Sequence, residues 1–140
     1  MKKQKKPLIF LQGHGTYTNE TIVAIGAAGK DIVKFAKKIG VKSEIQEWLE
    51  KSLTGDNKLV REGDQGFILT HDNGATVLSI RKYERGWKFW EVLVHEICHL
   101  VDFVLRNNKL MEREMEACAY QSEFLFREIG FRVREYYDKK

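Results

Sequence analysis

The sequence has little cysteine, a single proline and no long apolar run. Its two cysteines, Cys98 and Cys118, stand alone, which excludes the disulfide framework of a small secreted domain. No apolar stretch reaches the length of a membrane span. Residues 8–11 are apolar and follow a Lys cluster, but they are too few for a signal peptide and lack a small-residue cleavage site. We therefore expect a cytoplasmic protein with no membrane partner.

Pro/Gly/Ser-rich linkers and internal repeats are also lacking. With 140 residues, 43% of them hydrophobic, the chain can form one core, so we expect a single domain over residues 1–140. The net charge of +4 is modest, and much of it lies at the two ends. We expect residues 1–6 to form a frayed basic tail. Without a basic stripe interleaved with aromatic residues, we expect no nucleic-acid partner.

Periodicity predicts the secondary structure of the first half. Residues 7–12 form a short strand, and the apolar spacing over residues 18–39 predicts a helix. A second helix is expected to begin at Ser43, with Gln46 completing a capping box. Residues 66–71 and 75–83 read as the two strands of a hairpin, because the Asp-Asn-Gly segment between them favours a tight turn.

Two further helices are expected in the second half, at about residues 89–106 and 112–129, with Gly130 just beyond the end of the last one. The order of elements predicts an α+β fold in which the helices pack on a small antiparallel sheet.

The segment His95-Glu96-Ile97-Cys98-His99 lies inside the first of these two helices. Histidines four positions apart share one helix face and can bind one tetrahedral zinc ion. Glu96 points elsewhere and can act as a general base on the attacking water, as in the H-E-x-x-H motif. The alternative is that these three side chains lie on an exposed helix face and have no role in metal binding.

A zinc site of this kind needs a third protein ligand. Asp102 shares the histidine face, but three ligands from one helix would surround the ion poorly, so Asp102 is better placed to accept an imidazole N–H; the alternative is a solvated carboxylate. The last helix offers four glutamates. Glu116 is favoured because small residues follow it, which allows a close helix approach. The others are Glu112, Glu114 and Glu123. We expect Cys98 and Cys118 to be buried.

These residues resemble the gluzincin metallopeptidases, in which a glutamate on a later helix is the third zinc ligand. The His-Glu-Ile-Cys-His and Glu-Ala-Cys-Ala-Tyr segments are similar to those of the minimal gluzincins (minigluzincins) and of small metallopeptidases encoded by phages and mobile elements. The Glu-Met-Glu-Ala segment at residues 114–117 resembles ImmA/IrrE-type peptidases, although the Asn or Asp that often follows their third ligand is absent. The resemblance covers about residues 75–126.

The resemblance implies a zincin-like fold with Zn²⁺ held by His95, His99 and Glu116, and with Glu96 as the general base. It also implies that a strand, here residues 75–83, edges the cleft and pairs with a peptide or protein substrate. Tyr120 is a candidate donor to the oxyanion, although a core tyrosine is the more common role. The other candidate donors are Tyr83, His71 and His14, the last expected in a flexible loop.

The sequence thus predicts a zinc metallopeptidase that hydrolyses peptide bonds. Three alternatives remain open: a non-catalytic metal-binding regulatory or interaction module of the same fold, a helical interaction protein without metal, and a hydrolase of non-peptide amides. Neither the substrate nor the oligomeric state follows from the residues.

Overall fold

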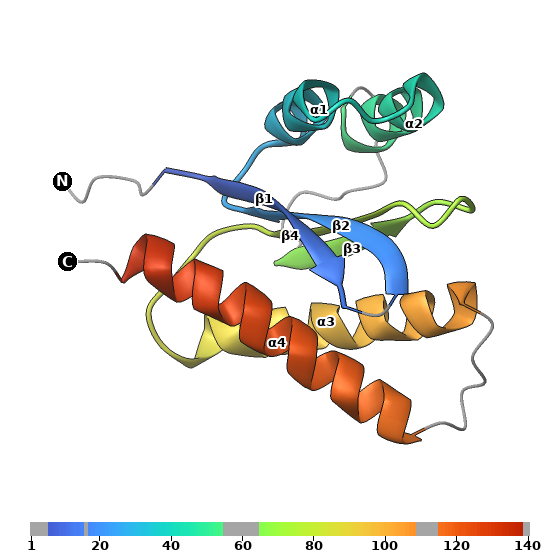
Figure 1. Ribbon diagram of the computed structural model, residues 1–140. Helices are drawn as coiled ribbons and strands as arrows, with labels where there is room; N and C mark the ends of the chain where they lie inside the picture. Colours follow the sequence, from blue (N-terminus) through green and yellow to red (C-terminus); the bar gives the residue numbers. More distant parts are fainter. Residues whose placement is uncertain (1–5, 16, 55–64, 109–114, 139–140) are drawn as a thin grey trace, which may run out of the picture.

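The computed structural model describes residues 6–15, 17–54, 65–108 and 115–138 of the chain. Two layers of helices enclose a four-stranded sheet (Figure 1). In chain order the elements are β1 Leu8–His14, β2 Tyr17–Ile25, α1 Gly29–Lys38, α2 Ser43–Leu53, β3 Gly66–Thr70, β4 Thr76–Ile80, α3 Trp87–Asn107 and α4 Met115–Tyr137. The α+β class is confirmed, and the expected tail at residues 1–6 lies almost entirely outside the described residues.

The sheet is mixed, so the expectation of an antiparallel sheet is wrong. Its strand order is β1-β2-β4-β3, and β2 and β4 pair in parallel, with Val23 opposite Leu78. The other two pairings are antiparallel. A parallel pair needs a crossover connection, and α1 and α2 lie in the segment of chain between β2 and β4.

The strand β2 replaces the first part of the helix predicted at residues 18–39. All five residues from Thr21 to Ile25 are buried, because β2 is an inner strand with helices on both faces of the sheet. A strand buried on both faces has a continuous apolar run, which periodicity alone does not separate from a helix. Gly26, with φ of +69°, follows the strand, and only residues from Gly29 onward are helical.

Each face of the sheet has its own core. The helices α1 and α2 cover one face, with Ile32 and Leu49 packed on side chains that include Val77. The helices α3 and α4 cover the other face, with Leu100 and Leu125 fully buried in the second core. The proposed metal motif belongs to this second layer (Figure 1).

Two predicted helix ends are wrong. Lys42, not Ser43, caps α2, and the Gln46 side chain donates to the backbone carbonyl of Val41 rather than closing a capping box. Gly130 does not end α4, which continues to Tyr137. It is buried, and a Cβ added there would lie 3.6 Å from the Trp90 ring, so a small residue allows α4 to approach α3.

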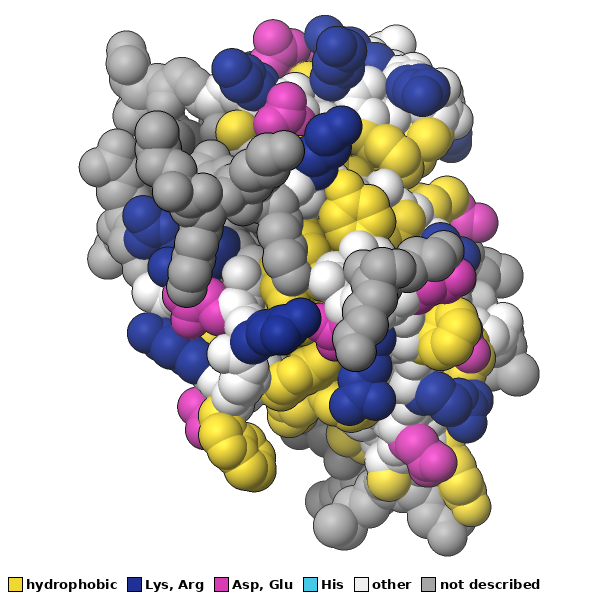
Figure 2. All heavy atoms as spheres, turned by 90° about the vertical axis from the view of Figure 1, so that its left-hand side faces the viewer, with side chains coloured by type: hydrophobic (Ala, Val, Ile, Leu, Met, Phe, Trp, Pro, Cys, Tyr) yellow, Lys and Arg dark blue, Asp and Glu magenta, His cyan; other side chains and the backbone are white. Residues whose placement is uncertain are grey.

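The end of the molecule at which β1 begins and α4 ends shows many Lys and Arg side chains, with acidic side chains among them (Figure 2). None of the described helices combines the length and apolar character that crossing a membrane requires.

Candidate metal centre

The helix α3 is amphipathic, and this places the two histidines at the surface. One side, which includes Leu93, Ile97 and Leu100, is buried against the sheet and α4. His95 and His99 lie on the exposed side, one turn apart. The first turn contains no acidic residue.

The two imidazoles converge on one point. Their Nε2 atoms lie 3.2 Å apart, and the ring planes cross at 81°. Two nitrogens bound to one tetrahedral zinc ion at roughly 2.0–2.1 Å would lie roughly 3.3 Å apart. The pair therefore has the spacing that zinc requires. The same distance also allows a direct hydrogen bond, in which one ring donates its Nε2–H and the other accepts.

Glu96 turns away from the histidine side, toward the sheet. Its side chain is 7% exposed and lies against the start of β3, where a Cβ added to Gly66 would be 3.1 Å from the Glu96 Cγ atom. Glu96 and His95 line the same cavity of about 330 Å³, between the start of β3 and the second and third turns of α3. Both residues therefore border one space, as a general base and a metal ligand would have to do.

The strand at the cleft is β3, not the segment at residues 75–83 that we expected. The order β1-β2-β4-β3 makes β4 an inner strand, paired on both sides, whereas β3 is an edge strand. Gly66, the first residue of β3, and Gln65 just before it line the cavity with His95 and Glu96. The hairpin and the motif helix are thus confirmed. The strand that borders the site is the first strand of the hairpin, β3, and not the second.

The proposed third zinc ligand is a glutamate near the start of α4. Glu116 lies in the first turn of α4, but its side chain, like Glu112 and Glu114, lies outside the described residues. Within the described part of the chain, no three His, Cys, Asp or Glu side chains form a group that could hold a metal ion. Glu123 is exposed on α4 and is not part of such a group.

The middle of α4 packs on a different side of α3 from the histidines. Trp90 contacts the Phe126 ring edge to face, at 6.0 Å between centroids, and lies next to Gly130. Trp90 is five residues before His95, which is about 140° around the helix. This middle part of α4 therefore does not face the histidine pair.

Asp102 forms an ion pair with Arg106, one turn further along α3, with 3.2 Å between Arg106 Nε and each carboxylate oxygen. Both side chains are more than half exposed. The described hydrogen bonds include none from an imidazole to Asp102, so its role in orienting a histidine stays a prediction.

Tyr120 is 68% exposed, so it is not a core tyrosine. It lies in the second turn of α4, and its part in catalysis remains untested. The expectation that Cys98 and Cys118 are buried is wrong, since both thiols are exposed.

His14 is not in a flexible loop. It ends β1 and is 1% exposed, with Nε2 2.6 Å from the Thr21 hydroxyl oxygen, which itself lies 2.5 Å from that of Thr76. The Gln121 side chain of α4 donates to the His14 carbonyl oxygen at 3.3 Å. Burial lowers the pKa of His14 to about 4, so the imidazole is neutral at physiological pH. Sequence reasoning missed this buried polar network, because Gly13 and Gly15 on either side suggested a loop.

The two remaining oxyanion candidates have other contacts. His71 packs edge to face on Trp48 and lies 4.0 Å from Glu44, both on α2, which covers the opposite face of the sheet from α3. Tyr83 donates to Asp138 at 2.7 Å and stacks on Tyr137. Burial, aided by the Asp138 carboxylate, raises the pKa of Tyr83 to about 12.

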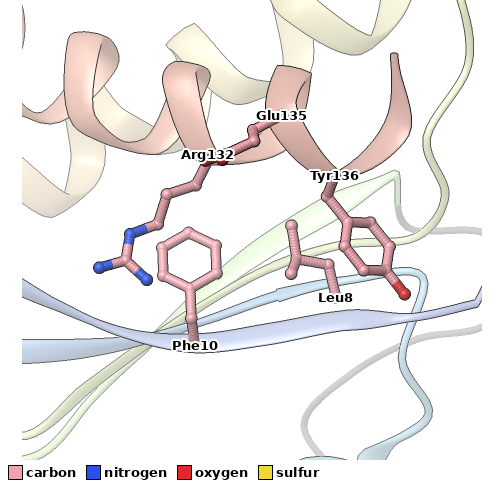
Figure 3. Close-up of a pocket in the computed structure, with 5 residues that line it drawn as sticks. All are labelled: Leu8, Phe10, Arg132, Glu135 and Tyr136. Atoms are coloured by element: carbon pink, nitrogen blue, oxygen red, sulfur yellow. The ribbon is translucent and has the colours of Figure 1, made fainter. Parts of the chain in front are cut away.

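A second hollow of about 330 Å³ lies between β1 and α4. Leu8 and Phe10 project from the strand toward Arg132 and Tyr136 of the helix (Figure 3), and the Arg132 guanidinium lies 4.9 Å from the Phe10 ring centroid. Glu135 supplies its only carboxylate among the described lining residues, and neither His nor Cys lines it. This hollow therefore lacks the groups for metal-assisted hydrolysis.

No protein-family model matches the chain, and comparison with curated proteins and with solved structures gives no match. The resemblance to gluzincins rests on the motif residues and stays a prediction.

Proposed function

We propose that the protein is a zinc-dependent peptidase centred on α3. The observation that carries this proposal is the convergence of the His95 and His99 Nε2 atoms at 3.2 Å, next to a cavity that His95 shares with Glu96. The distance fits two ligands of one tetrahedral zinc ion. The shared cavity supports a base acting close to that ion.

His95 and His99 would hold the ion, with Glu116 as the proposed third ligand. A bound zinc ion would lower the pKa of a water molecule and polarise the scissile carbonyl. Glu96 accepts the proton of the attacking water and passes it to the leaving amine. Tyr120 is the proposed donor to the oxyanion, and Asp102 the proposed partner of a ligating imidazole.

The edge strand β3 supports a peptide as the substrate. The outer edge of an edge strand presents backbone N–H and C=O groups that an extended chain can pair with. Since the start of β3 lines the cavity with His95 and Glu96, a peptide paired there would run past both residues. This arrangement favours a peptide over a small amide.

The decisive experiment separates metal binding from catalysis at Glu96. The Glu96→Gln variant should retain zinc, because Glu96 is not a ligand, and should lose at least about a hundredfold in kcat/KM on any peptide that the wild type cleaves. Wild-type protein that binds zinc but cleaves no peptide in a broad library would favour the non-catalytic metal-binding module. Equal cleavage by Glu96→Gln would contradict the mechanism.

A further inference from the structure

The cavity beside His95 has walls that the proposed mechanism does not use. Its lining residues come from the start of β3 and from two turns of α3: Gln65, Gly66, Glu91, Val92, His95 and Glu96. Its volume of about 330 Å³ exceeds that of one large amino-acid side chain. It opens next to the position where a peptide paired with β3 would lie.

The walls combine an apolar side with hydrogen-bond acceptors. Val92 is half-buried and supplies the apolar side, and Gly66 packs so closely on it that an added Cβ would lie 2.9 Å from Val92 Cγ1. The Glu91 carboxylate, one turn before His95, accepts hydrogen bonds only, and the Gln65 amide offers a further carbonyl oxygen. No Lys or Arg is among the described residues that line the cavity.

Two cations lie close by without lining it. Lys88 is exposed on α3, and Arg81 donates its backbone N–H to the Gln65 carbonyl oxygen at 2.9 Å. Among the described residues that line the cavity, the carboxylates belong to Glu91 and Glu96. A zinc ion bound by His95 would offset the Glu96 carboxylate, so Glu91 sets the charge at the rim. An acidic substrate side chain would be repelled, and a short apolar one would leave the rim carboxylate without a partner.

We propose that this cavity binds a lysine or arginine side chain of the substrate and that Glu91 selects it. The proposal rests on the peptidase function stated above. The aliphatic stem of the substrate side chain would pack on Val92, and its cationic head would meet the Glu91 carboxylate. Glu91 is thus a specificity residue that contacts substrate without taking part in bond cleavage.

The test uses three sets of fluorogenic peptides, identical except for Lys, Met or Glu at one position on either side of the scissile bond. Wild-type protein should prefer Lys over Met by about fivefold in kcat/KM, since an exposed ion pair contributes at most about 1 kcal/mol. Glu91→Gln should abolish this preference mainly through KM, and Glu91→Lys should reverse it in favour of Glu. High salt should weaken the preference. The matched control is Glu47→Gln on α2, which changes the net charge equally on the other face of the sheet.

A binding readout separates this inference from the function on which it rests. Glu96→Gln protein, mixed with labelled peptides, should bind the Lys peptide about fivefold more tightly than the Met peptide, and Glu91→Gln should remove the difference. Equal binding, or a preference unchanged by Glu91→Gln, would overturn the assignment even if the wild type cleaves peptides. A Glu91-dependent preference in a wild-type protein that cleaves none of them would uphold the subsite and contradict the proposed catalysis.

Discussion

Gly66→Ala tests how closely the edge strand and the general base approach each other. A Cβ at this position would lie 2.9 Å from Val92 Cγ1 and 3.1 Å from both Glu96 Cγ and the Ser79 backbone oxygen. Carbon atoms in favourable contact are roughly 3.5–4.0 Å apart, so the strand or α3 must shift. Overpacking of this kind costs about 1–3 kcal/mol. Removing the freedom of glycine in the unfolded chain offsets about 0.4–1 kcal/mol of that cost.

We therefore expect Gly66→Ala to lower the free energy of unfolding by about 1–2 kcal/mol in urea titrations followed by tryptophan fluorescence. The folded variant should still take up zinc, because the atoms nearest the added Cβ belong to Val92, Glu96 and Ser79 and not to the histidines. It should hydrolyse peptides more slowly, because Glu96 is displaced.

Gly13→Ala is the matched control in another strand. A Cβ added to Gly13 would have no heavy atom within 4 Å other than those of its chain neighbours. It should therefore unfold as the wild type does, or be more stable by up to about 1 kcal/mol. If the two variants had the same stability, the close packing of β3 on α3 would be refuted.

Three more predictions concern other parts of the molecule. His14 has a pKa of about 4 in the fold against 6.5 when unfolded, so the unfolded state takes up more protons between these values. The free energy of unfolding is therefore highest above the unfolded pKa and should fall by about 2 kcal/mol as the pH is lowered to about 4.5. In urea unfolding, the stability of His14→Gln should depend less on pH over this range. Asn19 is buried and bonds to Gly74, Asn107 and Asn108, so Asn19→Ala should cost about 1–3 kcal/mol of thermal or urea stability, and a change below about 0.5 kcal/mol would contradict the network. Asp102→Asn should change stability by less than about 0.5 kcal/mol, because its ion pair is exposed, but should weaken zinc binding at least about tenfold if Asp102 orients an imidazole; unchanged zinc affinity would remove that role.

Local sequence patterns were sufficient to predict the helix that carries the metal motif and the hairpin before it. The apolar spacing of α3 and the turn at Asp72, Asn73 and Gly74 both depend on neighbours within a few residues, and the structure confirms the motif helix and the hairpin. The side of α3 that carries His95 and His99 follows from the same helical period, and the structure confirms that they lie together.

Long-range pairing could not be predicted in the same way. Residues 22–25 are apolar on both faces because helices cover both sides of the sheet. The parallel pairing of β2 with β4 depends on the crossover through α1 and α2. Because the strand order is β1-β2-β4-β3, β3 is the edge strand and borders the cleft. The burial of His14 depends on partners in β2 and α4, far away in the chain.

Zinc binding by the histidine pair is the central claim, and a competition titration against a chromophoric chelator tests it most directly. The wild type should bind about one zinc ion per chain, His95→Ala and His99→Ala should lose it, and Glu96→Gln should keep it. The Glu116→Ala variant, measured in the same titration, should bind zinc more weakly because it removes the proposed third ligand. A wild-type chain that takes up no zinc, or a His95→Ala variant that binds it equally well, would contradict the account.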